Sequence, residues 1–259
     1  MDCNKEHDCE THYRSLSVSE VTNDCYAVFQ PIYNIDDMSI ISFEALLRHP
    51  IVSTDEIINW AEKYGYMHEI FEVIVSKAIS VIMHTGVPVT VNISPSQIIS
   101  NTKKVEGLLK NVISKHKVPQ FHLNIEVTEA VPISDIDAFM DGLHKIKKLG
   151  VKVFLDDFGA GYSSFSMLRN GIFDAIKMDK TIVHRISNNR LMQHFLSSIL
   201  TYASMVGMHV VAEGVEKNDD FTVLKSIGIS LVQGYLFSKP LDQNSTLKLF
   251  SIEDDYQKL

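Results

Sequence analysis

Polar side chains recur at or just beyond the ends of short apolar runs along this 259-residue sequence. A charged residue in an apolar strand is costly to bury unless it is paired or bound to a metal, so its repetition on successive strands indicates one shared site. The residues in these positions are Gln30, Glu44, Asn92, Glu126, Asp156, Lys177, Glu213 and Gln233.

The acidic members of this set suit hard divalent cations. Carboxylate and carbonyl oxygens are the ligands that Mg²⁺ and Mn²⁺ prefer. The candidate metal ligands are Glu44, Asn92, Glu126, Asp156, Asp157 and Glu213. Five carboxylates alone would repel a phosphodiester, whereas two divalent ions that share Asp156 reduce the net charge of the site to minus one. We therefore expect two Mg²⁺ or Mn²⁺ ions per site.

A two-metal site favours hydrolysis of a phosphodiester. It polarises a phosphoryl oxygen and lowers the pKa of a bound water from 15.7 toward about 7. Lys177 would lie beside that water, as a general base or as a positioning group, and the sequence leaves both roles open. Alone, Lys177 would also fit the Schiff-base lysine of an aldolase-type barrel, but the clustered metal-type ligands favour the phosphodiesterase interpretation.

The segment 156–164 follows an apolar run and precedes a helical pattern, so its glycines supply a tight loop that holds Asp157. Its glycine spacing resembles a dinucleotide-binding fingerprint. That interpretation fails because Ser164 stands where the third glycine belongs, and two acidic residues line the approach expected for pyrophosphate.

Short β-branched or aromatic runs that alternate with helical patterns predict a parallel sheet wrapped by helices. Eight such runs, together with a length near the 250 residues typical of the fold, predict a single α/β TIM-type (β/α)8 barrel over residues 25–259, after a short flexible lead at 1–24. The predicted strands are 26–32, 40–46, 88–93, 122–127, 152–156, 175–178, 209–212 and 231–234. The clearest predicted helices are 54–63, 69–83, 135–149 and 191–206.

Composition narrows the class further. A formal net charge of -8 disfavours general electrostatic binding to nucleic acid or to an anionic membrane. The longest stretch without charged residues, 191–212, is interrupted by many polar side chains, and the N-terminus lacks the pattern of a signal peptide. Cys3, Cys9 and Cys25 all precede the first strand and leave the core without a disulfide, which fits a reducing, cytoplasmic location.

The motifs resemble those of the EAL family of cyclic-di-GMP phosphodiesterases. The signature Glu44-Ala45-Leu46 is preceded by Gln30-Pro31-Ile32, and seven segments match in family order. These segments are 43–48, 92–97, 126–129, 156–159, 177–179, 213–216 and 233–241. The departures are small, with Ala160 and Lys239 in places that often hold Thr or Ser and Arg, and neither removes a ligand.

The resemblance implies hydrolysis of cyclic di-GMP to linear 5′-pGpG. It implies that Glu44, Asn92, Glu126 and Asp156 serve one metal ion and that Asp156, Asp157 and Glu213 serve the other. Lys177 and Gln233 would act on the attacking water. Together with Glu44, Asp156 and Glu213 they make up the implied catalytic set. The implied substrate-binding set is Gln30, Leu46, Arg48, Asp179, Glu216 and Pro240, in which Asp179 and Glu216 look like supports behind the ligands. Glu129 would anchor the glycine-containing loop.

Two further expectations concern activity and assembly. Catalytically silent relatives, which act as cyclic-di-GMP receptors or bind partner proteins, usually lose Glu44, one of the paired aspartates or Lys177, and this sequence keeps all of them. Ca²⁺ is expected to bind and inhibit, because its larger radius disturbs in-line attack.

The resemblance also implies a stand-alone homodimer that pairs through apolar residues near the loop, with a regulatory protein as a further partner. These residues are Phe165, Met167, Leu168, Ile172 and Phe173. The N-terminal Cys3, His7, Cys9 and His12 match no common zinc spacing.

Overall fold

Eight strands close into a mixed barrel in the computed structural model, which describes residues 18–128, 133, 135–160, 167–169 and 171–250. The order around the barrel is β2-β3-β4-β5-β6-β7-β8-β1, and β1 closes it by pairing with both β2 and β8. The strands are β1 (Tyr26–Asn34), β2 (Ile40–Arg48), β3 (Val89–Asn92), β4 (Leu123–Thr128), β5 (Val153–Phe158), β6 (Ala175–Met178), β7 (His209–Ala212) and β8 (Leu231–Val232). The predicted TIM-type barrel is therefore confirmed.

The prediction of an all-parallel sheet is wrong at β1, which runs antiparallel to β2 and to β8. Only residues 35–39 connect β1 to β2, and a parallel crossover needs a dozen residues or more. The first two strands therefore form a hairpin without a helix between them. A ninth strand that the sequence did not reveal, β9 (Leu241–Asp242), pairs with β1 at Val28 and Phe29.

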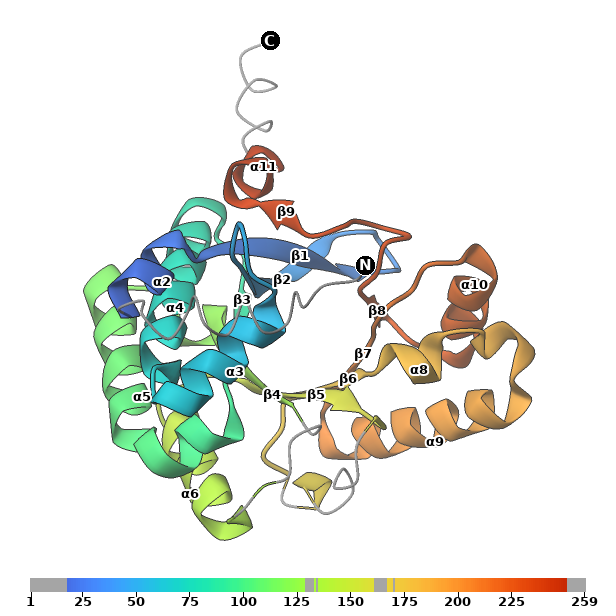
Figure 1. Ribbon diagram of the computed structural model, residues 1–259. Coiled ribbons are helices and arrows are strands. Elements are labelled where there is room, and N and C mark those ends of the chain that lie inside the picture. The colour runs from blue at the N-terminus through green and yellow to red at the C-terminus, as the bar shows by residue number, and fades with distance from the viewer. Residues whose placement is uncertain (1–17, 129–132, 134, 161–166, 170, 251–259) are drawn as a thin grey trace, which may run out of the picture.

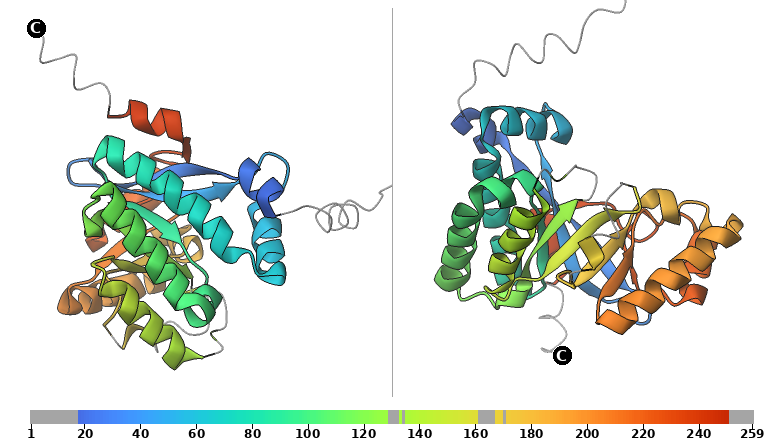
Figure 2. Two further views of the ribbon diagram at one scale, coloured as in Figure 1. Left: turned by 90° about the vertical axis from the view of Figure 1, so that its left-hand side faces the viewer. Right: turned by 90° about the horizontal axis from the view of Figure 1, so that it is seen from below.

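Helices cover the outside of the barrel (Figures 1 and 2). Figure 1 shows α3 to α6 on one side and α8 to α10 on the other, with α11 beyond β9. Their bounds are α2 (Val18–Asp24), α3 (Thr54–Tyr64), α4 (Met67–Thr85), α5 (Pro95–His116), α6 (Ile136–Lys147), α8 (Lys180–Val183), α9 (Arg190–Val206), α10 (Asn218–Ile227) and α11 (Gln243–Lys248), with 3-10 turns η1 (Gln120–His122) and η2 (Ile186–Asn188). No helix in the described ranges is long and apolar enough to cross a membrane.

Local sequence determines where the helices that flank the site begin. Ser94 caps α5 by accepting a hydrogen bond from the Gln97 amide, while Gln97 accepts one in return from the Ser94 amide, and Pro95 occupies the first turn. Ser53 and Glu56 form the same reciprocal cap on α3. These helices therefore begin within a few residues of the ends of β3 and β2.

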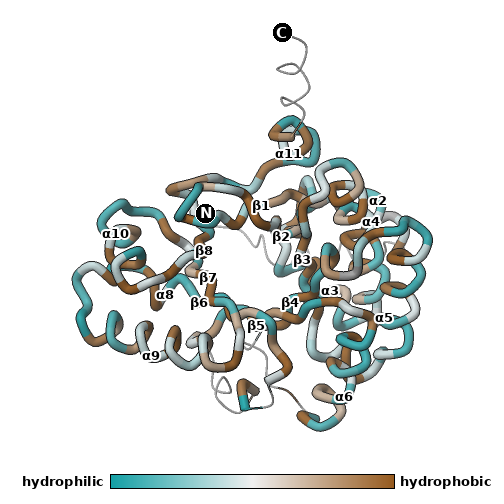
Figure 3. The backbone as a smooth tube through the Cα atoms, turned by 180° about the vertical axis from the view of Figure 1, so that it is seen from behind, coloured by the Kyte–Doolittle hydropathy of each residue, from teal (hydrophilic) through white to brown (hydrophobic). Residues whose placement is uncertain are grey.

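The main apolar core lies between the strands and the helices. Hydrophobic and hydrophilic residues alternate along the helices, as expected for helices that bury one face (Figure 3). The barrel interior differs, since its buried polar residues include Glu44, Glu126, Lys177 and Gln233. Apolar residues inside the barrel form a second, separate cluster of Ile32, Val211 and Leu231. The interior is therefore divided into a charged part and a small apolar part.

Several predicted features fall at the edges of the described chain. In the predicted lead at 1–24, the described part forms α2, with Val21 buried. The cluster of Cys3, His7, Cys9 and His12 lies outside the described residues, as does Phe165. The other apolar residues expected at a dimer face, Met167, Leu168, Ile172 and Phe173, are buried within this chain and pack in its own core.

Candidate metal centre and active site

The ammonium group of Lys177 lies among four carboxylates inside the barrel. Lys177 stands on β6 with its side chain 1% exposed, and its Nζ is 2.9 Å from Glu44 Oε2 and 2.7 Å from Glu126 Oε1. Nζ is also 3.3 Å from Asp156 Oδ1 and contacts Glu213 Oε1. Residues that are 133 positions apart in sequence thus meet in one cluster, as the sequence predicts.

The acidic residues form two trios that share Asp156. One trio is Glu44, Glu126 and Asp156, and the other is Asp156, Asp157 and Glu213. Within each trio, one carboxylate oxygen from each residue lies within 4.8 Å of the others. This is the grouping expected for two neighbouring cations that share one bridging carboxylate.

The electrostatics of the cluster show an excess of buried negative charge. Burial raises the pKa of Glu126 well above its usual range, with Asp156, Glu44 and Glu213 adding to the effect and Lys177 opposing it. Burial likewise raises the pKa of Glu213 to about 8 and raises that of Asp156. Although burial by itself would lower the pKa of Lys177, the four carboxylates raise it well above its ordinary value. One ammonium group does not balance these carboxylates.

Orphaned oxygens support the fit to metal ions. Glu126 Oε2 is fully buried and accepts no hydrogen bond from any described residue, whereas Glu126 Oε1 and Asp156 Oδ1 have only their ion-pair contacts with Lys177 Nζ, at 2.7 Å and 3.3 Å. Buried polar atoms nearly always have a partner, so these oxygens need a further cation or water. Hard oxygen donors at this spacing suit Mg²⁺ or Mn²⁺.

Glu44 connects the polar residues of the centre. It accepts hydrogen bonds from Asn92 Nδ2 at 3.0 Å and from Gln233 Nε2 at 2.9 Å, in addition to its contact with Lys177. Burial by itself would raise the pKa of Glu44, but Lys177 and the two amides lower it below its ordinary value. Because Asn92 donates through its nitrogen, its carbonyl oxygen is the atom available to a metal.

The backbone at Asp157 allows two successive residues to serve one site. Successive side chains of a strand point to opposite faces, but Asp157 adopts φ +53 in the left-handed region, where the β5 pairing is irregular. Thr128 Oγ1 donates a 3.1 Å hydrogen bond to Asp157 Oδ2. Sequence reasoning assigned no role to Thr128, although it lies two positions after Glu126 on the same strand face.

A close backbone approach holds Gln233 in place. A Cβ added to the next residue, Gly234, would lie 2.2 Å from the carbonyl oxygen of Val215. The Val215 amide donates to the Gln233 carbonyl at 3.1 Å, and the Gln233 amide donates to the Ala212 carbonyl at 2.9 Å. Glycine at 234 is therefore required sterically, and the loop after β7 keeps Gln233 beside Glu44.

A cleft of about 340 Å³ opens beside the carboxylates. Its lining includes Leu46, Arg48, Asn92, Asp156 and Asp157, so two of the predicted substrate residues share it with predicted metal ligands. Thr54, Ile58, Met67 and Ser94 also line it, and sequence reasoning did not single these out. Arg48 is held at its edge by hydrogen bonds from Nη1 to the Leu47 carbonyl at 2.7 Å and to Thr54 Oγ1 at 3.3 Å.

The remaining predicted site residues occupy different surroundings. Gln30 is the strand partner of Glu44 and donates a 3.4 Å hydrogen bond to the Ser238 carbonyl. Asp179 is buried and caps α8 by accepting from the Thr181 amide at 2.9 Å. Glu216 is exposed, and Pro240 is half-buried just before β9. Glu129 lies outside the described residues.

The fold and the site together define a TIM-like α/β barrel with an acidic, metal-type cluster inside its mouth. The chain belongs to the EAL domain family, whose model matches residues 14–240. It is 30% identical over 224 residues to the cyclic di-GMP phosphodiesterase NbdA of Pseudomonas aeruginosa, an alignment that covers 82% of this chain and 28% of NbdA. The chain thus spans little more than a quarter of that relative's length.

Solved structures show the same fold. BlrP1 of Klebsiella pneumoniae, in a complex with manganese and cyclic di-GMP, matches with a TM-score of 0.77 and 31% identity over 85% of this chain and 57% of BlrP1. A stand-alone EAL protein of Vibrio cholerae in its cyclic-di-GMP-bound form matches with a TM-score of 0.75 and 26% identity, covering 85% of this chain and 93% of that one.

Proposed function

We propose that this chain hydrolyses cyclic di-GMP to linear 5′-pGpG with two Mg²⁺ or Mn²⁺ ions. The observation that carries the proposal is the pair of carboxylate trios that share Asp156. Within each trio the carboxylate oxygens lie within 4.8 Å of one another, and the trios lie beside the cleft that Leu46 and Arg48 line. Relatives of the same family are cyclic-di-GMP phosphodiesterases at about 30% identity. The two trios contain five of the six metal ligands predicted from the sequence, all except Asn92.

Glu44, Asn92, Glu126 and Asp156 would hold one ion, and Asp156, Asp157 and Glu213 the other. When bound, the ions supply a nucleophilic water at neutral pH and stabilise the charge that develops on the phosphodiester. Arg48 and the backbone near Leu46 would position a substrate phosphate in the cleft, and Gln30 would help to seat the ligand. Glu216 and Pro240 stay in the proposed substrate-binding set.

Lys177 and Gln233 orient groups within the centre. The carboxylates around Lys177 keep it protonated in the metal-free protein, so in that state it donates hydrogen bonds and does not accept a proton. Bound cations would oppose this effect of the carboxylates, so both proposed roles of Lys177, general base and positioning group, are kept. Gln233 donates to Glu44 and thereby holds the Glu44 carboxylate in one orientation.

The test is incubation of the purified chain with cyclic di-GMP and Mn²⁺ or Mg²⁺, with products separated by chromatography. We expect 5′-pGpG, no product in excess EDTA, and little turnover with Ca²⁺. Turnover that is unchanged in EDTA contradicts the proposal. Tight binding of cyclic di-GMP without turnover in either metal would instead establish the alternative, a silent receptor. The predicted dimer, partner protein and cytoplasmic location stay predictions, and light scattering tests the first.

A further inference from the structure

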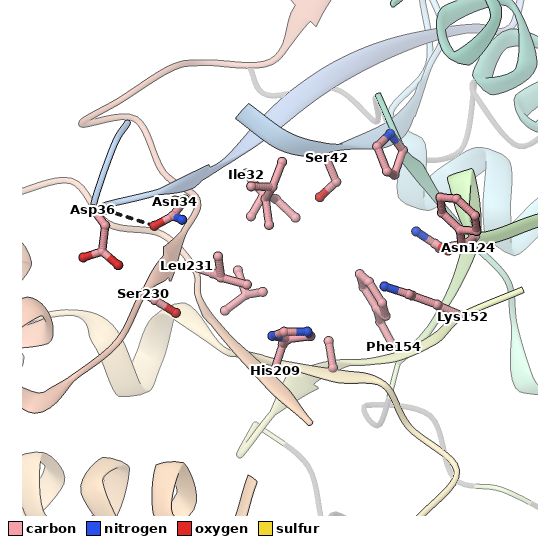
Figure 4. A pocket seen from close by; sticks show the side chains of 15 residues that line it. Ile32, Asn34, Asp36, Ser42, Asn124, Lys152, Phe154, His209, Ser230 and Leu231 are labelled. Carbon is pink, nitrogen blue, oxygen red and sulfur yellow. Dashed lines mark hydrogen bonds between the residues drawn. The ribbon is translucent and has the colours of Figure 1, made fainter. Parts of the chain in front are cut away.

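A second cavity, of about 470 Å³, lies at the opposite mouth of the barrel from the carboxylates. The residues that line it lie where strands β4 to β8 begin and where β1, which runs antiparallel to its neighbours, ends (Figure 4). Enzymes with this fold place their chemistry at the carboxyl ends of the strands, and the amino-terminal mouth usually serves stability. An open cavity of a size typical for small-molecule sites therefore needs another explanation.

One wall of this cavity carries a buried polar group without a partner. Asn124 on β4 is 2% exposed, and its Oδ1 accepts no hydrogen bond from any residue in the described part of the chain. Ser42 on β2 is also buried and lines the cavity. Buried amides nearly always have hydrogen-bond partners, so the Asn124 side chain indicates a ligand or water that completes its bonding.

The facing wall is apolar. Ile32, Val211 and Leu231 form the small interior cluster that is separate from the main core, and all three line the cavity. Phe154 adds an aromatic ring to the lining, and Figure 4 shows the labelled side chains arranged around a central space. A polar wall opposite an apolar wall suits a flat ring with hydrogen-bonding groups on one edge.

The rim of the cavity carries a lysine ammonium group and an imidazole ring. Lys152 and His209 line the cavity and are exposed. Lys152 lies beside Asn124, because its carbonyl accepts a 3.0 Å hydrogen bond from the amide of Ile125. Asp36 is the one carboxylate among the described residues that line the cavity. It lies across the cavity from Lys152 in an exposed turn, where its amide donates to Asn34 Oδ1.

We propose that this amino-terminal mouth is a second binding pocket, which takes a flat heteroaromatic anion of the size of a nucleoside monophosphate. The ring lies between Phe154 and the apolar wall, and a donor on its edge pairs with Asn124 Oδ1. Lys152 and His209 contact the anionic group. The pocket is independent of the proposed phosphodiesterase activity, because none of its lining residues belongs to the carboxylate cluster or its cleft.

Isothermal titration calorimetry of the full chain in EDTA, with GMP and AMP as separate probes, tests this pocket. EDTA removes divalent ions that would otherwise bind phosphate at the carboxylates. We expect one nucleotide per chain, with affinity at least about tenfold weaker for guanosine and for inorganic phosphate than for GMP. No binding of either nucleotide at millimolar concentration overturns the proposal, as does phosphate binding as tightly as GMP.

Matched variants locate the binding. Asn124→Leu should weaken it by at least about tenfold, because the hydrogen bond to Asn124 Oδ1 is lost. Thr90→Val is the control: Thr90 is also buried and its hydroxyl has no hydrogen-bond partner among the described residues, but it does not line the cavity, so affinity should be unchanged. Unchanged affinity in Asn124→Leu, or an equal loss in Thr90→Val, overturns the proposal.

Variants at the rim and in the other cleft complete the test and do not depend on the folding of Asn124→Leu. Lys152→Gln changes an exposed side chain and should weaken GMP binding while leaving guanosine binding unchanged. Arg48→Ala, in the cleft beside the carboxylates, should leave GMP binding unchanged. GMP binding that is lost in Arg48→Ala but kept in Lys152→Gln places the nucleotide at the carboxylate end and overturns the second pocket.

Discussion

Lys177 Nζ lies 2.9 Å from Glu44 Oε2 across the interior of the barrel, although β6 and β2 are not neighbours in the sheet. Both side chains are buried, and this contact brings the one buried ammonium group of the described interior to the carboxylate that also binds Asn92 and Gln233. The carboxylates are thereby affected unequally, since the pKa of Glu44 is lowered whereas the pKa values of Glu126 and Glu213 are raised. The unequal pKa values lead to opposite expectations for variants of these carboxylates.

Neutralising single carboxylates should change the stability of the metal-free protein in opposite directions. At pH 7.5 in EDTA, Glu213→Gln should raise the free energy of unfolding by roughly 1–3 kcal/mol, because folding of the wild type at this pH requires Glu213 to take up a proton that the unfolded chain has released, whereas the neutral amide needs none. Glu44→Gln should lower the free energy of unfolding, because the ionised form of Glu44 is favoured in the folded state. Urea denaturation measures both values. The same direction of change in both variants would contradict the assigned electrostatics.

The stability of the metal-free protein should fall as pH rises from about 4.5 to about 8. In this window folded Glu213, with its pKa near 8, holds a proton that the unfolded chain has already released at its ordinary pKa of 4.5. Because the folded state binds more protons, raising the pH favours unfolding. Melting temperatures measured in EDTA across this range test the slope, which should be shallower in Glu213→Gln. A slope that is equally steep in the variant would show that Glu213 does not cause it.

Adding Mn²⁺ should stabilise the chain and remove much of this pH dependence. An ion that binds only the folded state stabilises it by about 2.7 kcal/mol at one hundred times its dissociation constant. The ligands must be deprotonated to bind, so metal affinity should rise with pH. Differential scanning calorimetry with and without Mn²⁺ is the measurement, and Asp156→Asn, which removes the carboxylate shared by both trios, should lose most of the stabilisation. An equal shift in Asp156→Asn would place the ion elsewhere.

Thr128→Val should weaken the metal-dependent activity without unfolding the barrel. The substitution keeps the shape of the side chain but removes the hydroxyl that donates to Asp157 Oδ2, a bond to a charged group worth about 1.5–3 kcal/mol. We expect roughly a tenfold higher Mn²⁺ concentration for half-maximal activity. Thr128→Ser retains the hydroxyl and should stay near the wild-type value. If both variants behave alike, Thr128 does not position Asp157.

Gly234→Ala should destabilise the protein and misplace Gln233. The added methyl group would overlap the backbone of Val215, which cannot move without breaking the hydrogen bonds of the loop after β7. We expect the free energy of unfolding to fall by about 1–3 kcal/mol. Gly107→Ala is a matched control inside α5, where a Cβ meets nothing within 4 Å, and it should stabilise by about 0.5–1 kcal/mol. Chemical denaturation of both variants separates the steric overlap at position 234 from the general effect of replacing glycine with alanine.

Much of the barrel could be predicted from the sequence, because buried strands appear as short apolar runs bounded by turns. The predicted runs at 175–178 and 209–212 coincide with β6 and β7. The antiparallel direction of β1 was missed, although the seven residues between the predicted strands 26–32 and 40–46 are too few for a parallel crossover. β9 could not be predicted, because two residues carry no periodicity, and its pairing with Val28 and Phe29 arises from long-range docking.

The sequence by itself determined which residue types stand at the strand ends, and therefore the chemistry that the site can perform. Only the tertiary structure decided how they meet: that Lys177 contacts four carboxylates on or just after other strands, that the left-handed backbone of Asp157 lets it join Asp156, and that Thr128 supports Asp157. The cavity around Asn124 is likewise a product of closure. The residue type at each position can be read from the local sequence. Distances across a barrel depend instead on how all eight strands pair, which no single segment specifies.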